Sequence, residues 1–189
     1  MYGDGDLIIG DKTPQYGLDM SLLKEMWPKA RFIHLVRDGM YASRSMTKHP
    51  GFIKLINSTI STNELSKMTD GKSLFHASDD PEHKVKHLHL WADNIESILQ
   101  EAKKIPTGDY LEIRYEDLIR YPRNTIGRIY NFLELEMNKE IIDRSAVMIK
   151  PFYFFRSYRG EKSEKLRNSY QENETLSRLM NRFGIPHSK

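Results

Sequence analysis

The sequence predicts an α/β fold in which a parallel β-sheet is flanked by helices, within a single domain over residues 1–189. Segments with the pattern of strands alternate with segments with the pattern of helices, which is typical of parallel sheets with right-handed crossovers. The run from Phe32 to Val36 is almost continuously apolar, as in a strand buried on both faces. A chain of 189 residues is also long enough to bury a substantial core.

Composition and charge narrow the class of protein. The 29 basic and 26 acidic residues leave a net charge of +3, which is too small to indicate a nucleic-acid partner. The chain has no cysteine, so disulfides, thiolate catalysis and cysteine-ligated zinc are excluded. We find no apolar run long enough to span a bilayer and no secretory segment. We therefore expect a cytoplasmic protein without a membrane segment, and the oligomeric state stays open.

The first half of the chain contains two predicted strands. Residues 7–12 have the pattern of a short buried strand, and the apolar spacing in residues 16–26 predicts a helix that ends before Pro28. The strand at residues 32–36 leads into a helix over residues 40–47, which Asp38 is placed to cap. In residues 51–80, the apolar residues at 52–56 suggest a short helix and residues 58–80 are polar, and we expect a mobile excursion there that covers the substrate.

The second half starts with a strong helix signal, Asp80-Pro81-Glu82, followed by apolar residues at helical spacing to about Lys103. Residues 110–115 alternate as a third strand, with Leu111, Ile113 and Tyr115 on one face. Further helices are predicted to begin at Pro122 and to cover the ranges 138–149 and 171–183.

Arg37 and Ser45 indicate a phosphate site. Arg37 directly follows a buried strand, where its charge needs a partner, and Ser45 lies eight positions later on the predicted helix. Ligands bind at the carboxyl ends of strands in open α/β sheets. An arginine fork, a hydroxyl and a helix N-terminus at that edge suit a phosphate. The alternative is that Arg37 pairs with Asp38 or another surface acid and that Ser45 is a surface hydroxyl.

Two more residues lie at the carboxyl ends of predicted strands. Lys12 lies at the end of the first strand, so two adjacent strands would deliver Lys12 and Arg37 to one edge of the sheet. Tyr115 ends the third strand, where it would form an aromatic wall beside a purine. The alternatives are a plain turn at Lys12 and a packed aromatic with a helix cap at Tyr115.

Taken together and in order, these motifs resemble the sulfotransferases that use 3′-phosphoadenosine 5′-phosphosulfate (PAPS), in particular the branch with bacterial and tyrosylprotein sulfotransferases. The resemblance covers residues 7–135 and implies a P-loop-NTPase-like sulfotransferase fold, with residues 151–189 as a C-terminal loop and helix. The segments that carry it are Gly10-Asp11-Lys12-Thr13-Pro14, Phe32-Ile33-His34-Leu35-Val36-Arg37-Asp38-Gly39 with Ser45, Leu88-His89-Leu90-Trp91, and Tyr115-Glu116-Asp117-Leu118 with Phe132-Leu133.

The resemblance implies an enzyme that transfers a sulfuryl group from PAPS, without a metal, to a hydroxyl or amine of a small-molecule, carbohydrate or peptide acceptor. Arg37 and Ser45 would hold the 3′-phosphate, and Tyr115 would lie near the adenine. Lys12 would face the sulfuryl group and stabilise charge on its oxygens. A late basic loop with Arg156 and Arg159 would complete the 3′-phosphate site, although a solvated basic face is the alternative there.

The family pattern is also broken. The Gly/Ser/Thr-rich loop that binds the 5′-phosphosulfate, and the catalytic acid after it, have no match here, since Gly3-Asp4-Gly5-Asp6 is acidic. We therefore expect an N-terminally truncated sulfotransferase. The alternative function is an inactive or partial fragment that binds PAPS or its product. A nucleotide-kinase-like protein ranks last, because the chain has no Gly-x-x-x-x-Gly-Lys-[Ser/Thr] motif.

Four polar residues have less specific interpretations. Asp11 could replace the missing catalytic acid, but a structural role ranks higher. His83 and His87 are spaced four apart, as in some zinc sites, yet lysines surround them. We expect a solvated helix face there and no metal site. His34 is expected to be a satisfied interior histidine.

Overall fold

The computed structural model describes residues 8–49, 81–149, 168 and 173–183. The excursion predicted over residues 51–80 and the loop with Arg156 and Arg159 lie outside these ranges. Within them, the elements in chain order are the 3-10 helix η1 (Pro14–Leu18), α1 (Met20–Met26), β1 (Phe32–Val36), α2 (Gly39–Met46), α5 (Pro81–Ala102), the 3-10 helix η2 (Thr107–Asp109), β2 (Tyr110–Arg114), α6 (Tyr115–Arg120), α7 (Pro122–Phe132), α8 (Lys139–Met148) and α11 (Glu174–Phe183).

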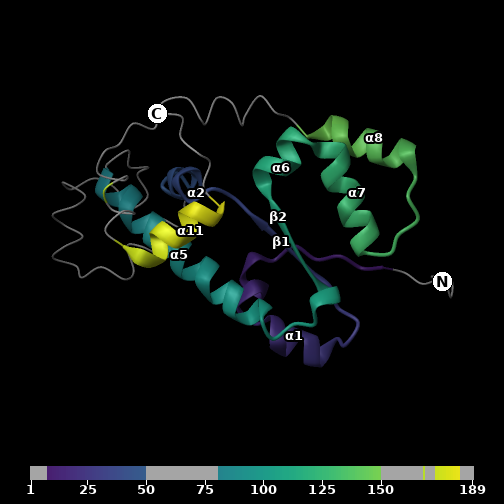
Figure 1. Ribbon diagram of the computed structural model, residues 1–189, viewed down its shortest axis with the longest axis horizontal. Helices are drawn as coiled ribbons and strands as arrows, with labels where there is room; N and C mark the ends of the chain where they lie inside the picture. The colour runs from purple at the N-terminus through teal and green to yellow at the C-terminus, as the bar shows by residue number, and fades with distance from the viewer. Residues whose placement is uncertain (1–7, 50–80, 150–167, 169–172, 184–189) are drawn as a thin grey trace.

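The two strands of the described sheet are parallel, as predicted. Phe32 lies opposite Tyr110, and Val36 lies opposite Arg114, so both strands end at the same edge. Helix α5 runs within the connection between the strands, which makes a β–α–β crossover. The helices α2, α5 and α11 lie on one side of the strand pair, and α6, α7 and α8 lie on the other (Figure 1).

Among the described residues, an apolar cluster joins one strand to three helices. Burial of this surface supplies the main driving force for folding, and α5 contributes the largest share of residues. The cluster consists of Val36 from β1, Met40, Tyr41 and Met46 from α2, Leu88, Trp91, Ala92, Ile95 and Leu99 from α5, and Leu176, Leu179, Met180 and Phe183 from α11.

Gly39 allows α2 to approach α5 closely. A Cβ atom added at Gly39 would lie 2.6 Å from Cε3 of Trp91 and 3.0 Å from Cδ1 of Leu88, both on α5. No other residue type fits there without movement of one helix. The close approach brings the start of α2, and with it the end of β1, against the central helix.

Two predicted elements near the start of the chain are wrong. Residues 8–12 form no strand, and Ile9 is 82% exposed, because no strand among the described residues is paired with them. The helix predicted over residues 16–26 is divided into η1 and α1, since Asp19 between them leaves the helical conformation with φ −131° and ψ 29°.

The prediction that β1 is buried on both faces is also wrong. Val36 is 2% exposed, but Ile33 and Leu35 on the opposite face are 39% and 48% exposed. Helix α7 packs against β2, where Ile113 is only 1% exposed. The neighbouring strip of β1 is left open to solvent.

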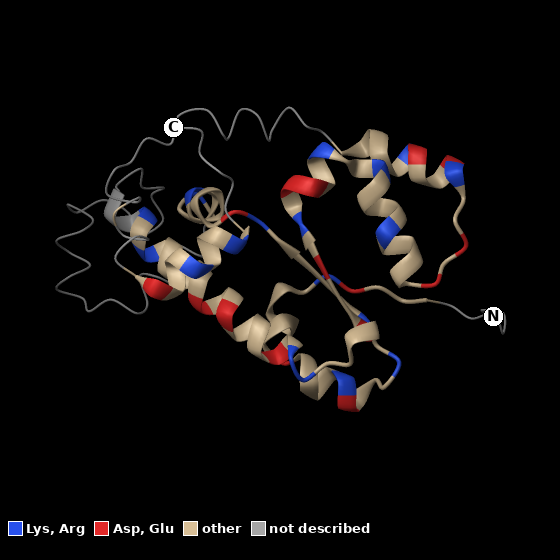
Figure 2. Cartoon of the chain, viewed as in Figure 1, with Lys and Arg blue, Asp and Glu red and all other residues tan. Residues whose placement is uncertain are grey.

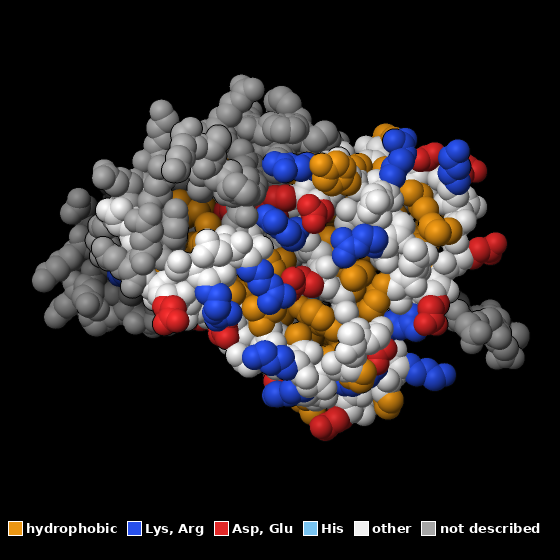
Figure 3. Space-filling view, viewed as in Figure 1, with side chains coloured by type: hydrophobic (Ala, Val, Ile, Leu, Met, Phe, Trp, Pro, Cys, Tyr) orange, Lys and Arg blue, Asp and Glu red, His pale blue; other side chains and the backbone are white. Residues whose placement is uncertain are grey.

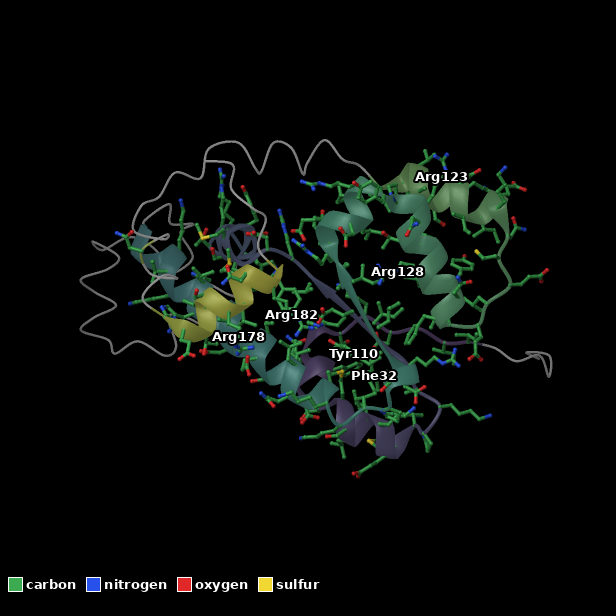
Figure 4. All side chains as sticks on the ribbon, in the orientation of Figure 1. Phe32, Tyr110, Arg123, Arg128, Arg178 and Arg182 are labelled. Carbon is green, nitrogen blue, oxygen red and sulfur yellow. The ribbon has the colours of Figure 1, made fainter. Side chains whose placement is uncertain are left out.

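Charges of both signs are spread over the described elements, including α5, α7 and α8 (Figure 2). Hydrophobic side chains reach the surface in the middle of this view (Figure 3), in the region where Phe32 and Tyr110 lie (Figure 4). Among the helices that the structure describes, none is both long and apolar enough to cross a membrane.

Candidate functional site

Arg37 and Tyr115 meet at the carboxyl edge of the sheet. Each directly follows a strand, and the register pairs Val36 with Arg114, the residues just before them. The guanidinium carbon of Arg37 lies 5.1 Å from the centroid of the Tyr115 ring, in cation–π contact. The sequence placed each of these residues at the end of a strand but did not pair them, and Tyr115 begins helix α6 and does not end the strand.

The guanidinium of Arg37 has hydrogen-bonding capacity left over. Its Nε is buried and has no hydrogen-bond partner, and the arginine forms no ion pair within the described ranges. A buried donor without a partner costs free energy, which an anionic ligand would recover. The alternative pairing with Asp38 is not found, because Oδ1 of Asp38 accepts a hydrogen bond from the Tyr41 amide at 3.2 Å instead.

Asp38 caps helix α2, as predicted, and it therefore occupies the helix N-terminus that we expected to face a phosphate. Its side chain is fully buried, and its carboxylate lies at the first turn of the helix. The positive end of the helix dipole therefore already faces a negative group. The helix N-terminus, which we expected to contribute to a phosphate site, serves this cap.

Ser45 is exposed near the end of α2, and its hydroxyl makes no hydrogen bond within the described part of the chain. Ser43 on the same helix is different, because it is buried and its Oγ donates to the Met40 carbonyl at 2.9 Å. Of these two serines, only Ser45 has a hydroxyl free for a ligand. The structure gives no contact between Ser45 and Arg37.

Lys12 is exposed in an extended segment before η1. The strand beside β1 is β2, so Lys12 does not reach the sheet edge on a paired strand as we expected. Asp11 accepts hydrogen bonds from the Lys12 amide at 2.8 Å and from the Thr13 hydroxyl at 3.2 Å, which is the structural role that ranked higher for this acid. The role of Lys12 stays a prediction, and Arg156 and Arg159 lie outside the described residues.

Glu116 is a residue that the sequence interpretation did not assign. It is 2% exposed, and its Oε1 accepts a hydrogen bond from the Asp38 amide at 3.1 Å. Its Oε2 lies 3.9 Å from Nε of Arg114. Arg114 in turn donates from Nη2 to the Phe183 carbonyl at 3.0 Å. Glu116 stood in the Tyr115-Glu116-Asp117-Leu118 segment that carries the family resemblance, but nothing in that segment gave it a role.

The burial of the α5 histidine His87 differs from the prediction, whereas His34 of β1 has the partner that was expected. His87 is 3% exposed, so the prediction of a solvated face is wrong for it, because this side of α5 is covered. Within the described residues there is no group of three or more His, Asp or Glu that could hold a metal ion. Nδ1 of His34 lies 2.8 Å from the Tyr110 hydroxyl, so this interior histidine has a partner, and burial lowers its pKa.

Comparison with known proteins supports the motif resemblance. The model of the sulfotransferase family matches residues 2–139. An omega-hydroxy-beta-dihydromenaquinone-9 sulfotransferase, Stf3, of Mycobacterium bovis is 26% identical over 160 residues, which cover 85% of this chain and 34% of the relative. A putative protein-tyrosine sulfotransferase of Caenorhabditis briggsae is 25% identical over 132 residues, which cover 70% of this chain and 39% of the relative.

A solved structure has the same fold. Sulfotransferase STF9 from Mycobacterium avium superposes with a TM-score of 0.53 at 16% identity, over 92% of this chain and 41% of that one. This likeness confirms the α/β sulfotransferase fold. The chain spans 34% and 39% of the lengths of the two curated relatives above. Because the family model covers most of the sequence, the chain belongs to the sulfotransferase family.

Proposed function

We propose that this chain binds PAPS at the carboxyl edge of β1 and β2 and takes part in transferring its sulfuryl group to an acceptor. Membership of the sulfotransferase family supports sulfuryl transfer in general. The names of both relatives above specify an acceptor with a hydroxyl, either an omega-hydroxy group or a tyrosine. We therefore favour a hydroxyl over an amine acceptor.

The buried and unpartnered Nε of Arg37, beside the ring of Tyr115, is the observation that carries the proposal. An arginine fork with free donors suits a phosphate, and an aromatic ring suits a purine. In the proposal, Arg37 and Ser45 bind the 3′-phosphate, while Tyr115 lies near the adenine. Arg156 and Arg159 would complete the phosphate site.

Lys12 has the proposed catalytic role. PAPS supplies a sulfuryl group whose transfer places negative charge on its oxygens, and a lysine ammonium can stabilise that charge. The exposed position of Lys12 leaves its ammonium free to meet a ligand. The proposal includes no metal ion.

Arg37→Ala tests the binding site. Titration calorimetry with adenosine 3′,5′-bisphosphate should show at least a roughly tenfold weaker affinity, because a charged hydrogen-bond pair is lost. The matched control is Arg128→Ala, which removes the same charge from an exposed position on α7 (Figure 4). Unchanged affinity in Arg37→Ala, or an equal loss in Arg128→Ala, would contradict the site.

The two serines of α2 and a transfer assay extend this test. Ser45→Ala should weaken binding of the bisphosphate. Ser43→Ala should leave this affinity unchanged, because its hydroxyl is already bonded within the helix.

A transfer assay distinguishes an active sulfotransferase from a fragment that only binds the nucleotide. It measures transfer of labelled sulfate from PAPS to a panel of alcohols and tyrosine peptides. Binding without any transfer would support the binding-only alternative.

A further inference from the structure

We propose that Glu116 is a positioning residue for the 3′-phosphate site, because it holds the turn from which Arg37 extends. This inference rests on the proposed function, since it assumes that Arg37 binds the 3′-phosphate. It adds two residues to the site, Glu116 and its partner Arg114, neither of which is expected to touch the nucleotide.

A hydrogen bond crosses the sheet edge from Glu116 to the backbone after β1. Oε1 of Glu116, at the start of α6, accepts from the amide of Asp38, 78 residues earlier in the chain. That amide belongs to the same planar peptide unit as the carbonyl of Arg37. The bond therefore fixes the backbone at the point where the Arg37 side chain leaves β1, directly beside Tyr115.

Burying an acid near an anion site costs free energy unless its charge is offset. A buried carboxylate requires hydrogen bonds or a cation, and a negative group would weaken phosphate binding. Nε of Arg114 lies 3.9 Å from Oε2 of Glu116 and offsets this charge. The charge of Arg37 then remains for the ligand, since its buried Nε has no hydrogen-bond partner within the described ranges.

Arg114 also links the site to helix α11. Arg114 donates to the carbonyl of Phe183, the last residue of α11, and Phe183 is itself 1% exposed. The contacts thus run from α11 through Arg114 and Glu116 to the amide of Asp38. A second acid of β2, Glu112, binds Arg182 of α11 at 2.8 and 2.9 Å. Glu112 helps to fasten the same helix but is not bonded to the Arg37 turn, so it is a matched control.

The experiment measures how much the 3′-phosphate adds to binding. Calorimetry on the full chain compares adenosine 3′,5′-bisphosphate with adenosine 5′-monophosphate, and the ratio of the two affinities isolates the 3′-phosphate. Glu116→Leu should lower this ratio by at least roughly tenfold, whereas Glu116→Gln, which keeps an acceptor oxygen, should stay within about threefold. Glu112→Leu should leave the ratio unchanged even if it lowers the melting temperature.

The outcomes separate this inference from the proposed function. A wild-type chain with no preference for the bisphosphate contradicts the proposed function. A preference that Arg37→Ala abolishes but Glu116→Leu retains overturns the role of Glu116 alone. If Glu116→Leu does not fold, Glu116→Asp carries the test, since it keeps the charge but withdraws the oxygen from the Asp38 amide. A wild-type ratio in Glu116→Asp then overturns the inference.

Discussion

Because Gly39 has no side chain, α2 and α5 can lie close together. Alanine is favoured over glycine inside a helix by about 1 kcal/mol. At Gly39 the added methyl would lie 2.6 Å from the Trp91 ring, and overpacking of this kind costs about 1–3 kcal/mol. The steric cost is the larger of the two, because the ring belongs to the buried core and cannot turn away.

We therefore predict that Gly39→Ala lowers the free energy of unfolding, measured by urea denaturation. Gly127→Ala in α7 is the control, since its Cβ would meet only the Met137 sulfur at 3.9 Å. This control should be neutral or stabilising by up to about 1 kcal/mol. Equal stabilisation by both substitutions would show that α2 and α5 are not in close contact.

At the scale of elements, α1 depends on α5 for its N-terminal cap. Asp19 precedes α1 but makes no side-chain cap bond. Glu101 of α5 takes its place, because its Oε2 accepts from the Ser21 amide at 3.0 Å and from the Ser21 hydroxyl at 2.6 Å. The Lys104 ammonium also bonds this carboxylate. The hydrogen bonds from Lys104 and then Ser21 lower the pKa of Glu101 from 4.5 to about 2.

The sign of the resulting pH dependence follows from this lowered pKa. The unfolded chain binds a proton at Glu101 more readily than the folded one, so the stabilisation is complete above about pH 4.5 and is lost as the pH falls towards 2. Urea denaturation of Glu101→Gln should show a flatter decline of stability between those values than wild type. Glu25→Gln, at an exposed position of α1, should keep the wild-type slope.

Local signals predicted some elements well and others poorly. The start of α5 at Pro81 was predicted from Asp80-Pro81-Glu82, because a capping residue and a first-turn proline affect only the neighbouring helical turn. Leu7-Ile8-Ile9 is equally apolar, yet no strand forms at residues 8–12, because a strand requires a neighbour that local sequence does not specify. The same distinction holds at the site. Arg37 and Tyr115 could each be placed at the end of a strand from the local sequence, but the bond from Asp38 to Glu116 spans 78 residues and has no local signature.

At the scale of the whole molecule, α11 completes the hydrophobic core, although it lies more than 70 residues after α5 in the sequence. Leu176 and Leu179 are fully buried in the cluster with α2 and α5. Two arginines of α11 form ion pairs, Arg178 with Glu96 of α5 and Arg182 with Glu112 of β2 (Figure 4). Exposed ion pairs contribute little, so apolar burial accounts for most of the helix's attachment.

Two leucines compare the buried core beneath α11 with the solvent-exposed face of β1. Leu179 of α11 has no exposed surface, whereas Leu35 of β1 is 48% exposed. Leu179→Ala should lower the free energy of unfolding by about 2–5 kcal/mol, because it leaves a cavity between α11 and α5. Leu35→Ala removes the same atoms from a partly solvated face and should cost at most about 1 kcal/mol. Urea denaturation of both variants measures the difference. A loss at Leu35 as large as that at Leu179 would mean that the open face of β1 is covered in solution.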